Sequence, residues 1–302
     1  MRRAVLFLDL ARGKSALFSV SEPVLCAMLA TGTIPSLRVC LLGILAALAG
    51  YFCVYSLNDL LDLRADREEI RLSSPDPLAW KPQVAHMDIM SLRHPVAAGA
   101  LPVWAAVTWV VVLGLIWFGA AYLLRPLCAY LFIGCAALEI IYCSLRRRTW
   151  LKVIPAAAMV AVGGLAGWFA VGKTTWGALA FFFLLYGWET GRNLTNDLAD
   201  VEHDRMVGIT TLASMRGPGV ASKVILADGM AMVLISLAQP VTWVVRGLLA
   251  AVALLTMTLP SLVLYRNPDE PSAQRYFNRL TFFPPFAAAC AIIVAVVTYF
   301  TR

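Results

Sequence analysis

The sequence predicts an all-α integral membrane protein with nine transmembrane helices and a cytosolic N-terminus. Three observations predict this class. First, 60% of the 302 residues are hydrophobic and only 14% are charged, with a mean hydropathy of +0.76, a balance that soluble domains do not show. Second, apolar stretches long enough to span a bilayer recur along the chain. Third, basic residues are concentrated in alternate loops.

Nine apolar stretches account for the predicted helices. The sixth of them is the shortest, and it ends in charged residues. In chain order they are approximately Ala16–Ile34, Val39–Leu57, Val96–Leu115, Leu127–Leu145, Val153–Val171, Ala178–Gly191, Val220–Ala238, Gly247–Tyr265 and Leu280–Phe300.

The distribution of Lys and Arg orients these helices. When the loops alternate from an inner N-terminus, all but five of the 25 Lys and Arg residues fall on the inner side, as the positive-inside rule requires. The net charge of +7 reflects this inner belt, which suits anionic lipid headgroups and phosphorylated substrates; nothing in the sequence indicates nucleic-acid binding. The five outer basic residues are Arg38, Arg125, Lys173, Arg246 and Arg302.

Cysteine and histidine do not indicate a metal or redox centre. The seven cysteines lie in apolar stretches without a CxxC pair, so we expect them to be small core side chains. The three histidines, His86, His94 and His203, are too scattered along the chain for a haem or di-histidine site.

An acidic decapeptide occurs twice in this apolar chain. Residues Asn58–Arg67 read NDLLDLRADR and residues Asn196–Arg205 read NDLADVEHDR, with six of the ten positions identical. Both copies follow even-numbered predicted helices, so we expect them on the same, cytosolic side of the membrane. This common placement would let the two copies form halves of one site.

The spacing of the acidic residues indicates what that site binds. If each copy continues a helix at about 100° per residue, Asp59, Asp62 and Asp66 fall within an arc of about 60°, and Asp200 and Asp204 lie about 40° apart. Such stripes of like charge persist when a cation neutralises them. Because carboxylates bind Mg²⁺ and leave coordination positions for phosphate oxygens, two facing stripes predict a clamp for Mg²⁺ and a diphosphate. The alternative is a pair of solvated helix ends.

Other polar segments have less specific interpretations. Glu22, next to Pro23 inside the first apolar stretch, is a candidate for the wall of a cavity or for a bond to a neighbouring helix. The loop Glu68–Leu92, which contains Trp80, is either a lid or a disordered excursion. The segment Tyr265–Arg279 is typical of a solvated connection. The Arg run after the fourth helix either anchors that helix or contacts phosphate.

Five landmarks resemble the UbiA superfamily of intramembrane prenyltransferases, and the resemblance covers most of the chain. The first decapeptide has the NDxxDxxxD form of that family, and the second has its DxxxD form. His94 departs from the family pattern, since it stands within what is usually an Arg-Pro step. The other landmarks are Arg93–Gly99, similar to RPL-x-SG, Tyr142–Arg147, similar to Y-S-x-x-KR, and Gly208–Leu212, similar to G-x-x-TL.

The resemblance implies a single domain, residues 1–302, in which helices surround a central cavity. The repeated motif suggests two pseudo-repeated halves, about 1–150 and 151–302. An isoprenyl diphosphate, bound through Mg²⁺, would be held between the two motifs, and its prenyl tail would run into the membrane. The enzyme would move the isoprenyl group to an aromatic or lipid-like hydrophobic acceptor and release diphosphate. We expect it in a cytoplasmic (inner) membrane, with two Mg²⁺ ions and an active site that faces the cytosol.

The resemblance also implies roles for individual residues. The expected catalytic carboxylates are Asp59, Asp62, Asp66, Asp200 and Asp204. The expected metal ligands are Asp59, Asp62, Asp66, Asp197, Asp200 and Asp204. The expected diphosphate-binding residues are Asn58, Arg67, Tyr142, Arg146, Lys152, Asn196 and Arg205.

Two other functions remain open at this point. A UbiA-type terpene cyclase would use the same clamp and would cyclise the prenyl cation without an acceptor. A secondary transporter also has many spans and internal similarity, but transporters place their binding sites near the bilayer midplane on broken helices. The repeated acids are instead predicted at the inner interface.

Overall fold

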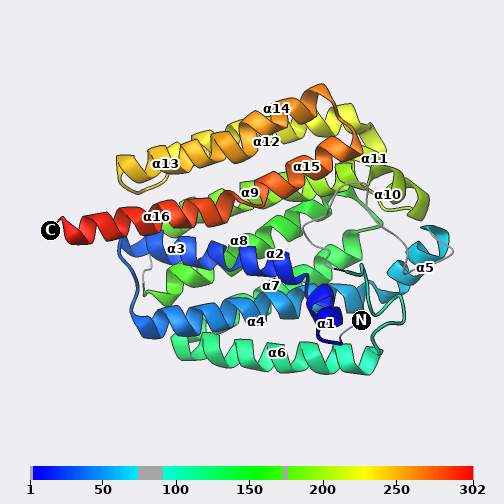
Figure 1. Cartoon of the computed structure of the whole chain (residues 1–302), viewed down its shortest axis with the longest axis horizontal. Coiled ribbons are helices and arrows are strands. Elements are labelled where there is room, and N and C mark those ends of the chain that lie inside the picture. Colours follow the sequence, from blue (N-terminus) through cyan, green and yellow to red (C-terminus); the bar gives the residue numbers. More distant parts are fainter. Residues whose placement is uncertain (1–2, 74–90, 173–175, 302) are drawn as a thin grey trace.

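The computed structural model describes residues 3–73, 91–172 and 176–301, and every regular element within these ranges is a helix. The long helices run side by side along the long axis of the molecule and form an elongated bundle (Figure 1). The part of the predicted polar loop that contains Trp80 and His86 lies outside the described residues, as does Lys173.

Seven stretches of the described residues are helical, long and apolar enough to cross a membrane. The chain is therefore an integral membrane protein. The stretches are Leu37–Leu61 (α4), Val103–Leu124 (α6), Pro126–Leu145 (α7), Trp150–Ala170 (the 3₁₀ turn η1, Trp150–Lys152, and α8, Val153–Ala170), Pro218–Leu237 (α12), Trp243–Arg266 (α13, Trp243–Ala253, the π-helix η2, Leu254–Thr258, and α14, Leu259–Arg266) and Glu270–Phe300 (α15, Glu270–Leu280, and α16, Phe283–Phe300).

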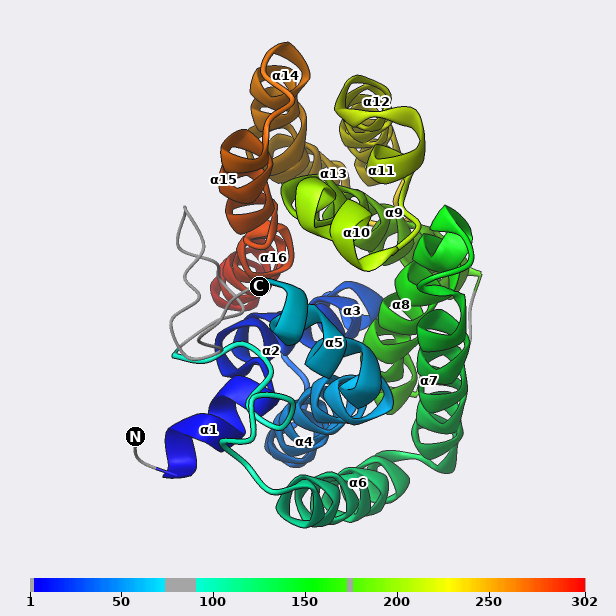
Figure 2. The ribbon, with the colours of Figure 1, turned by 90° about the vertical axis from the view of Figure 1, so that its right-hand side faces the viewer.

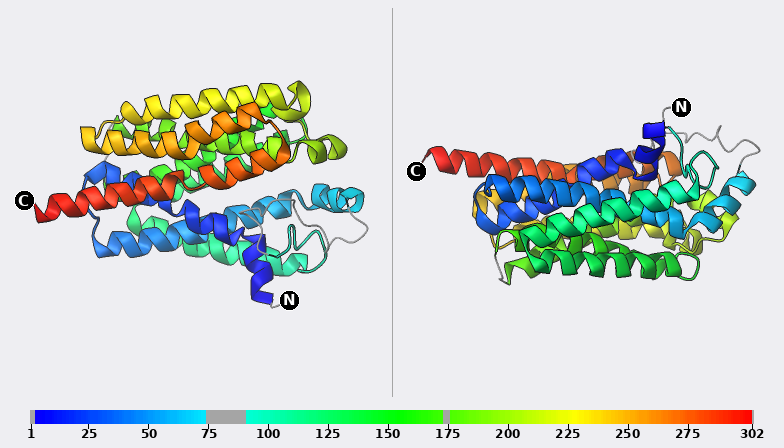
Figure 3. Two further views of the ribbon diagram at one scale, coloured as in Figure 1. Left: turned by 45° about the horizontal axis from the view of Figure 1, so that its top comes forward. Right: turned by 90° about the horizontal axis from the view of Figure 1, so that it is seen from below.

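The two other predicted stretches are helical as well. The first is divided between α2 (Gly13–Ser19) and α3 (Ser21–Thr31), which follow a short helix α1 (Arg3–Leu10). The sixth lies in α9 (Gly177–Ala199), whose second half carries the polar residues of the repeated motif. The chain turns sharply between α1 and α2 (Figure 3), where Arg12 has a left-handed backbone with φ of 46°.

Two sequence-based boundaries are wrong. The third helix, α6, begins at Val103 rather than at residue 96, because residues 95–101 form a turn that buries Val96 and Leu101 against Leu6 of α1. The predicted solvated connection 265–279 instead contains α15, which packs against α9 and buries Phe277. In both cases apolar side chains found partners that are distant in sequence.

The two decapeptides do not continue their helices, contrary to the sequence-based expectation. Helix α4 ends at Leu61 and α5 spans Leu63–Ser73, while α9 ends at Ala199 and α10 spans Val201–Val207. The break falls at the same position of each copy, with φ and ψ of −90° and 0° at Asp62 and of −108° and 16° at Asp200. These angles lie near the bridge region, where a helix changes direction. No Gly or Pro marks either break in the sequence.

Both short helices lie at one end of the bundle, which we call the motif end. Figure 2 looks onto this end, with α5 and α10 in front and the long helices behind them. Helix α11 (Leu212–Arg216) follows α10 there. The N-terminus is close to the motif end and the C-terminus projects from the opposite end (Figures 1 and 3).

Helix α9 forms the centre of the largest apolar core. It packs against α8, α12 and α15, and its side chains Phe181 and Trp188 are fully or almost fully buried. The indole N–H of Trp188 donates to the carbonyl oxygen of Leu280 at 2.8 Å. Helix α8 crosses α3 closely at Gly167, where a Cβ atom would lie 1.9 Å from the carbonyl oxygen of Pro23. This packing fixes α9 within the bundle.

Candidate active site

A polar pocket lies at the motif end, between the two copies of the decapeptide. Its walls come from the ends of α4 and α9, from α10, from the connection between α7 and α8, and from residues 92–94. Nine of the residues predicted for the site line this pocket, namely Asn58, Asp59, Tyr142, Arg146, Lys152, Asn196, Asp197, Asp200 and Asp204.

Arg146 and His94 contact the buried carboxylates of the first copy. Nη1 of Arg146 donates to Oδ2 of Asp62 at 2.6 Å and lies 3.5 Å from Oδ1 of Asp66. Nδ1 of His94 lies 3.0 Å from Oδ2 of Asp66 and 3.5 Å from Oδ1 of Asp59. Burial raises the pKa of Asp62, and the adjacent Arg146 guanidinium opposes this rise.

Lys152 and Arg93 contact the second copy. Nζ of Lys152 donates to Oδ1 of Asp197 at 2.8 Å, and both side chains are buried. Nη2 of Arg93 donates to Oδ2 of Asp200 at 3.3 Å. Burial and the neighbouring Asp197 carboxylate raise the pKa of Asp204 to about 8. The second copy therefore holds a carboxyl group that binds a proton at neutral pH.

The segment between α7 and α8 supplies one basic side chain to each copy of the decapeptide. Arg146 stands at its start and Lys152 at its end, so the segment between α7 and α8 bridges the two motifs. Thr210 anchors this segment, since its backbone N–H donates to the carbonyl oxygen of Arg146 at 3.3 Å and its hydroxyl to the next carbonyl at 3.0 Å. Two of the sequence landmarks, Tyr142–Arg147 and Gly208–Leu212, thus meet in space.

Asn58 links the first copy to neighbouring elements. Its amide nitrogen donates to Oε1 of Glu139 at 2.6 Å, and its carbonyl oxygen accepts from Nη2 of Arg12 at 3.4 Å. The Arg12 guanidinium also lies over the ring of Tyr55, 5.5 Å from its centroid. Arg12 therefore lines the polar pocket and also contacts the ring of Tyr55.

A second cavity, with almost entirely apolar walls, lies between α4, α6, α7 and α8. Along α4 its lining runs from Gly43 to Tyr55, about 18 Å of helix at 1.5 Å per residue. Tyr55 connects the two cavities, because its ring contacts Arg12 of the polar pocket. Tyr51, one turn away, donates its hydroxyl proton to the buried Glu22, so the predicted candidate Glu22 lies at the edge of this chamber.

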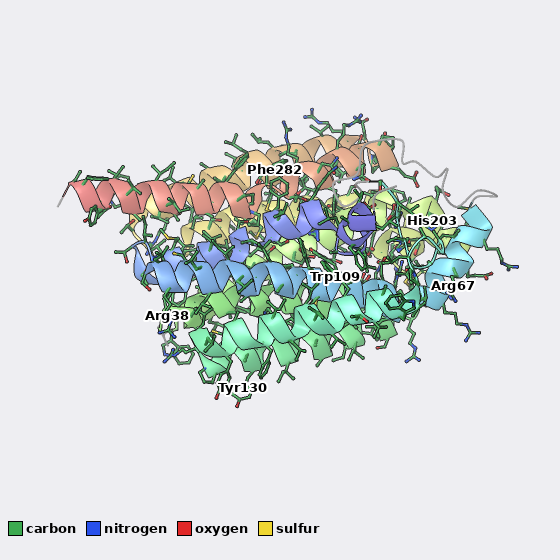
Figure 4. The ribbon with its side chains drawn as sticks, turned by 60° about the horizontal axis from the view of Figure 1, so that its bottom comes forward. Arg38, Arg67, Trp109, Tyr130, His203 and Phe282 are labelled. Carbon is green, nitrogen blue, oxygen red and sulfur yellow. The ribbon has the colours of Figure 1, made fainter. Side chains whose placement is uncertain are left out.

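Four predicted site residues do not line the polar pocket. Asp62 and Asp66 are buried and reach it through Arg146, as described above. Arg67 is exposed on α5 (Figure 4), and Arg205 is exposed on α10, where it donates to Glu202 at 2.9 Å. Arg38, at the other end of the bundle in Figure 4, marks the side remote from the motifs.

Several pocket residues were not predicted as site residues. Arg93, His94 and His203 line the pocket together with Arg12 and Asp9. Their positions adjoin landmarks in the sequence, with Arg93 and His94 opening one landmark and His203 lying inside the second decapeptide. A rule that polar residues within landmarks belong to the site would have found these three, while nothing in the sequence signals Arg12 or Asp9.

The donor set suits a divalent cation. One ligand atom each from Asp59, Asp66 and His94 lie within 4.8 Å of one another. The carboxylate oxygens are hard donors of the kind that Mg²⁺ binds. Within the described part of the chain, the buried Nδ1 atom of His94 has no hydrogen-bond partner. The first copy and His94 therefore bring together three ligand atoms that could hold one ion.

Solved structures share this architecture. A UbiA homolog from Aeropyrum pernix K1 is 20% identical with a TM-score of 0.72, over 92% of this chain and 97% of that one. A UbiA homolog from Archaeoglobus fulgidus, bound to DMAPP and Mg²⁺, is 15% identical with a TM-score of 0.70, over 96% and 99%. A digeranylgeranylglyceryl phosphate synthase is 14% identical with a TM-score of 0.65, over 98% and 100%. At such identities the likeness establishes the fold.

Sequence comparison assigns the family. No curated protein matches the chain significantly. The profile of the UbiA prenyltransferase family matches residues 22–283, which include both decapeptides and all five landmarks. The chain is therefore a membrane enzyme that belongs to the UbiA prenyltransferase family.

Proposed function

We propose that this protein catalyses Mg²⁺-dependent transfer of an isoprenyl group from an isoprenyl diphosphate to an aromatic or lipid-like acceptor. The observation that carries the proposal is the junction of the two cavities. A pocket lined by carboxylates and basic side chains suits Mg²⁺ and a diphosphate, and the adjoining apolar chamber suits a prenyl tail. The Archaeoglobus homolog, which binds DMAPP and Mg²⁺, supports this assignment.

In this proposal each decapeptide holds one Mg²⁺ ion, so the site holds two. Bound Mg²⁺ would neutralise the diphosphate and draw negative charge onto it as the C1–O bond of the donor breaks. Asp59, Asp62 and Asp66 would ligate the first ion, and Asp197, Asp200 and Asp204 the second. Asn58 and Asn196 would support these ligands, with Tyr142 beside them.

The basic side chains would position the leaving diphosphate. Arg146, Lys152 and Arg93 are already held at the pocket by the carboxylates. A diphosphate between the motifs would attract the same groups, and they would stabilise the charge that develops on it. Arg67 and Arg205, which are exposed and do not line the pocket, would add longer-range attraction.

The aromatic rings near the junction would stabilise the other product of bond cleavage. The prenyl group carries positive charge at C1 until the acceptor's electron pair forms the new bond. Tyr51 and Tyr55 line the chamber near the pocket, where their ring faces can interact with that charge. The apolar walls exclude water, which would otherwise consume the cation.

We further propose that the chain crosses a cytoplasmic (inner) membrane nine times and that its motif end faces the cytosol. The seven apolar helices, α2 with α3, and α9 would make the nine. Termini at opposite ends of the bundle support an odd number of crossings (Figure 1). The equivalent breaks at Asp62 and Asp200 support one domain of two pseudo-repeated halves, about 1–150 and 151–302.

Diphosphate release by the purified protein tests the proposal. The protein would be given C10 to C20 isoprenyl diphosphates and Mg²⁺, with and without a pool of aromatic and lipid acceptors. Release that requires an acceptor is expected, and mass spectrometry of the product would identify that acceptor. Release without an acceptor, with a hydrocarbon or alcohol product, would favour the terpene cyclase. Substrate flux into vesicles without bond cleavage would favour a transporter.

A further inference from the structure

His94 occupies a strained and buried position beside the first decapeptide. Its φ is 55°, in the left-handed region that non-glycine residues seldom adopt, and its side chain is only 8% exposed. Residues held in this way often lie at functional sites, where the surrounding structure maintains the strain. The imidazole points at two of the three aspartates of the first copy rather than at solvent.

The segment that carries His94 is anchored from both sides. Asp9 accepts hydrogen bonds from the backbone N–H groups of Ser91 at 3.0 Å and Leu92 at 3.2 Å, and also from the Ser91 hydroxyl. Leu92 and Val96 are buried in an apolar cluster with helix α1. The position of the imidazole is therefore set before any ligand binds.

The distances around Nδ1 match those between ligands of one ion. Two ligands about 2.1 Å from a metal ion lie about 3.0 Å apart when they subtend 90°, and about 3.4 Å apart at the tetrahedral angle. Nδ1 of His94 lies 3.0 Å from Oδ2 of Asp66 and 3.5 Å from Oδ1 of Asp59. Nδ1 is buried, and within the part of the chain that the structure describes its contacts, including those with these two oxygens, do not have the geometry of hydrogen bonds.

We propose that Nδ1 of His94 is a ligand of the cation held by Asp59 and Asp66, which makes the first site a mixed nitrogen and oxygen site. This inference rests on the proposed function, since it presumes that the first decapeptide binds a divalent ion. Imidazole nitrogen suits transition-metal ions better than it suits Mg²⁺. The first site therefore prefers an ion such as Mn²⁺ or Co²⁺ to Mg²⁺ more strongly than an all-oxygen site would.

Metal binding by His94 would also change its hydrogen bond with Arg93. Nε of Arg93 donates to Nε2 of His94 at 3.1 Å, so Nε2 accepts in the ion-free protein and a proton lies on Nδ1, which faces the carboxylates of Asp59 and Asp66. An imidazole bound through Nδ1 instead carries that proton on Nε2, so the Arg93 contact must open when the ion binds. Arg93, which already reaches Asp200 of the second copy, then remains between the motifs, where the diphosphate is expected.

Electron spin-echo spectroscopy of bound Mn²⁺ tests the ligand directly. The full-length protein in detergent would be labelled with ¹⁵N at histidine only, so that a ¹⁵N coupling to Mn²⁺ reports an imidazole ligand. The chain has only three histidines, so substitutions can assign the coupling. His94→Asn is suitable because Asn tolerates the left-handed backbone, and His203→Asn is the matched control inside the same pocket.

We expect a ¹⁵N coupling in the unsubstituted protein and in His203→Asn, and none in His94→Asn. Calorimetry should then show that His94→Asn weakens Mn²⁺ binding by about tenfold or more and Mg²⁺ binding by less. Bound Mn²⁺ without a ¹⁵N coupling, or a coupling that survives His94→Asn, would overturn the ligand and leave the proposed function intact. Failure of Mn²⁺ to bind at all would overturn both.

Discussion

The two decapeptides share six of ten residues, yet their surroundings differ. The first copy contacts a guanidinium and an imidazole, from Arg146 and His94. The second contacts a buried ammonium and a guanidinium, from Lys152 and Arg93. None of these four basic groups belongs to either decapeptide. The comparison teaches that the repeat sets the acids, while unrelated segments determine how each set of acids is neutralised.

The largest expected effect is on catalysis, and it should be equal for the two copies. Asp62→Ala and Asp200→Ala each remove a carboxylate at the helix break of one copy. Because both ions would stabilise the same diphosphate, we expect each substitution to lower kcat/KM by about 10²–10³-fold or more. Steady-state diphosphate release with Mg²⁺ measures this. A variant of either kind with intact Mg²⁺-dependent turnover would show that its copy holds no essential ion.

The next effect is on stability, and it should differ between the copies. Lys152 is the more deeply buried cation, with 5% of its side chain exposed against 15% for Arg146. Lys152→Met leaves the Asp197 carboxylate buried without its partner, so we expect a loss of about 3–5 kcal/mol in the free energy of unfolding. Arg146→Met should cost less. Thermal unfolding in detergent without Mg²⁺ compares them.

A double substitution controls that experiment. Lys152→Met combined with Asp197→Asn removes both charges, so most of the lost stability should return. If the double variant is as unstable as Lys152→Met alone, the loss reflects packing and not an uncompensated charge.

One pH effect should arise at the second copy. The pKa of Asp204 is raised to about 8, so below pH 8 this carboxyl group is protonated in the ion-free protein. Cation binding must release that proton, and apparent Mg²⁺ affinity should therefore rise up to tenfold per pH unit from pH 6 towards pH 8 and then level. Calorimetry in buffers of different ionisation enthalpy measures the released proton. Asp204→Asn should remove one released proton near pH 8, relative to the unsubstituted protein; an unchanged proton release would assign the proton elsewhere.

The smallest effects should come from the last residue of each copy. Arg67 and Arg205 occupy equivalent positions and are both exposed outside the pocket lining. Exposed charges act on a ligand over a distance and are screened by salt. We expect Arg67→Gln and Arg205→Gln to raise KM by no more than about threefold, and the effect should vanish at about 1 M salt, where the Debye length is about 3 Å. A larger, salt-independent change in one copy would mean direct contact with diphosphate.

The sequence by itself determined the class of the protein and the acids that are candidates for its site. Hydrophobic composition, span-length apolar stretches and the repeated decapeptide depend only on residue types and their order, so they identify a membrane protein and its two motifs without coordinates, and the five landmarks indicate the enzyme family. The landmark Tyr142–Arg147, which contains Arg146, could be placed on the same side of the membrane as the acids from the predicted topology.

Only the tertiary structure decided how the acids are arranged and what faces them. The breaks at Asp62 and Asp200 carry no Gly or Pro, so helical periodicity alone predicted continuous stripes. Arg12 and His94 reach the pocket because distant segments, held by Asp9 and by burial of Val96, fold over it. Contacts of this kind join residues tens of positions apart, and local spacing along the chain contains no information about which distant side chain will fill a given space.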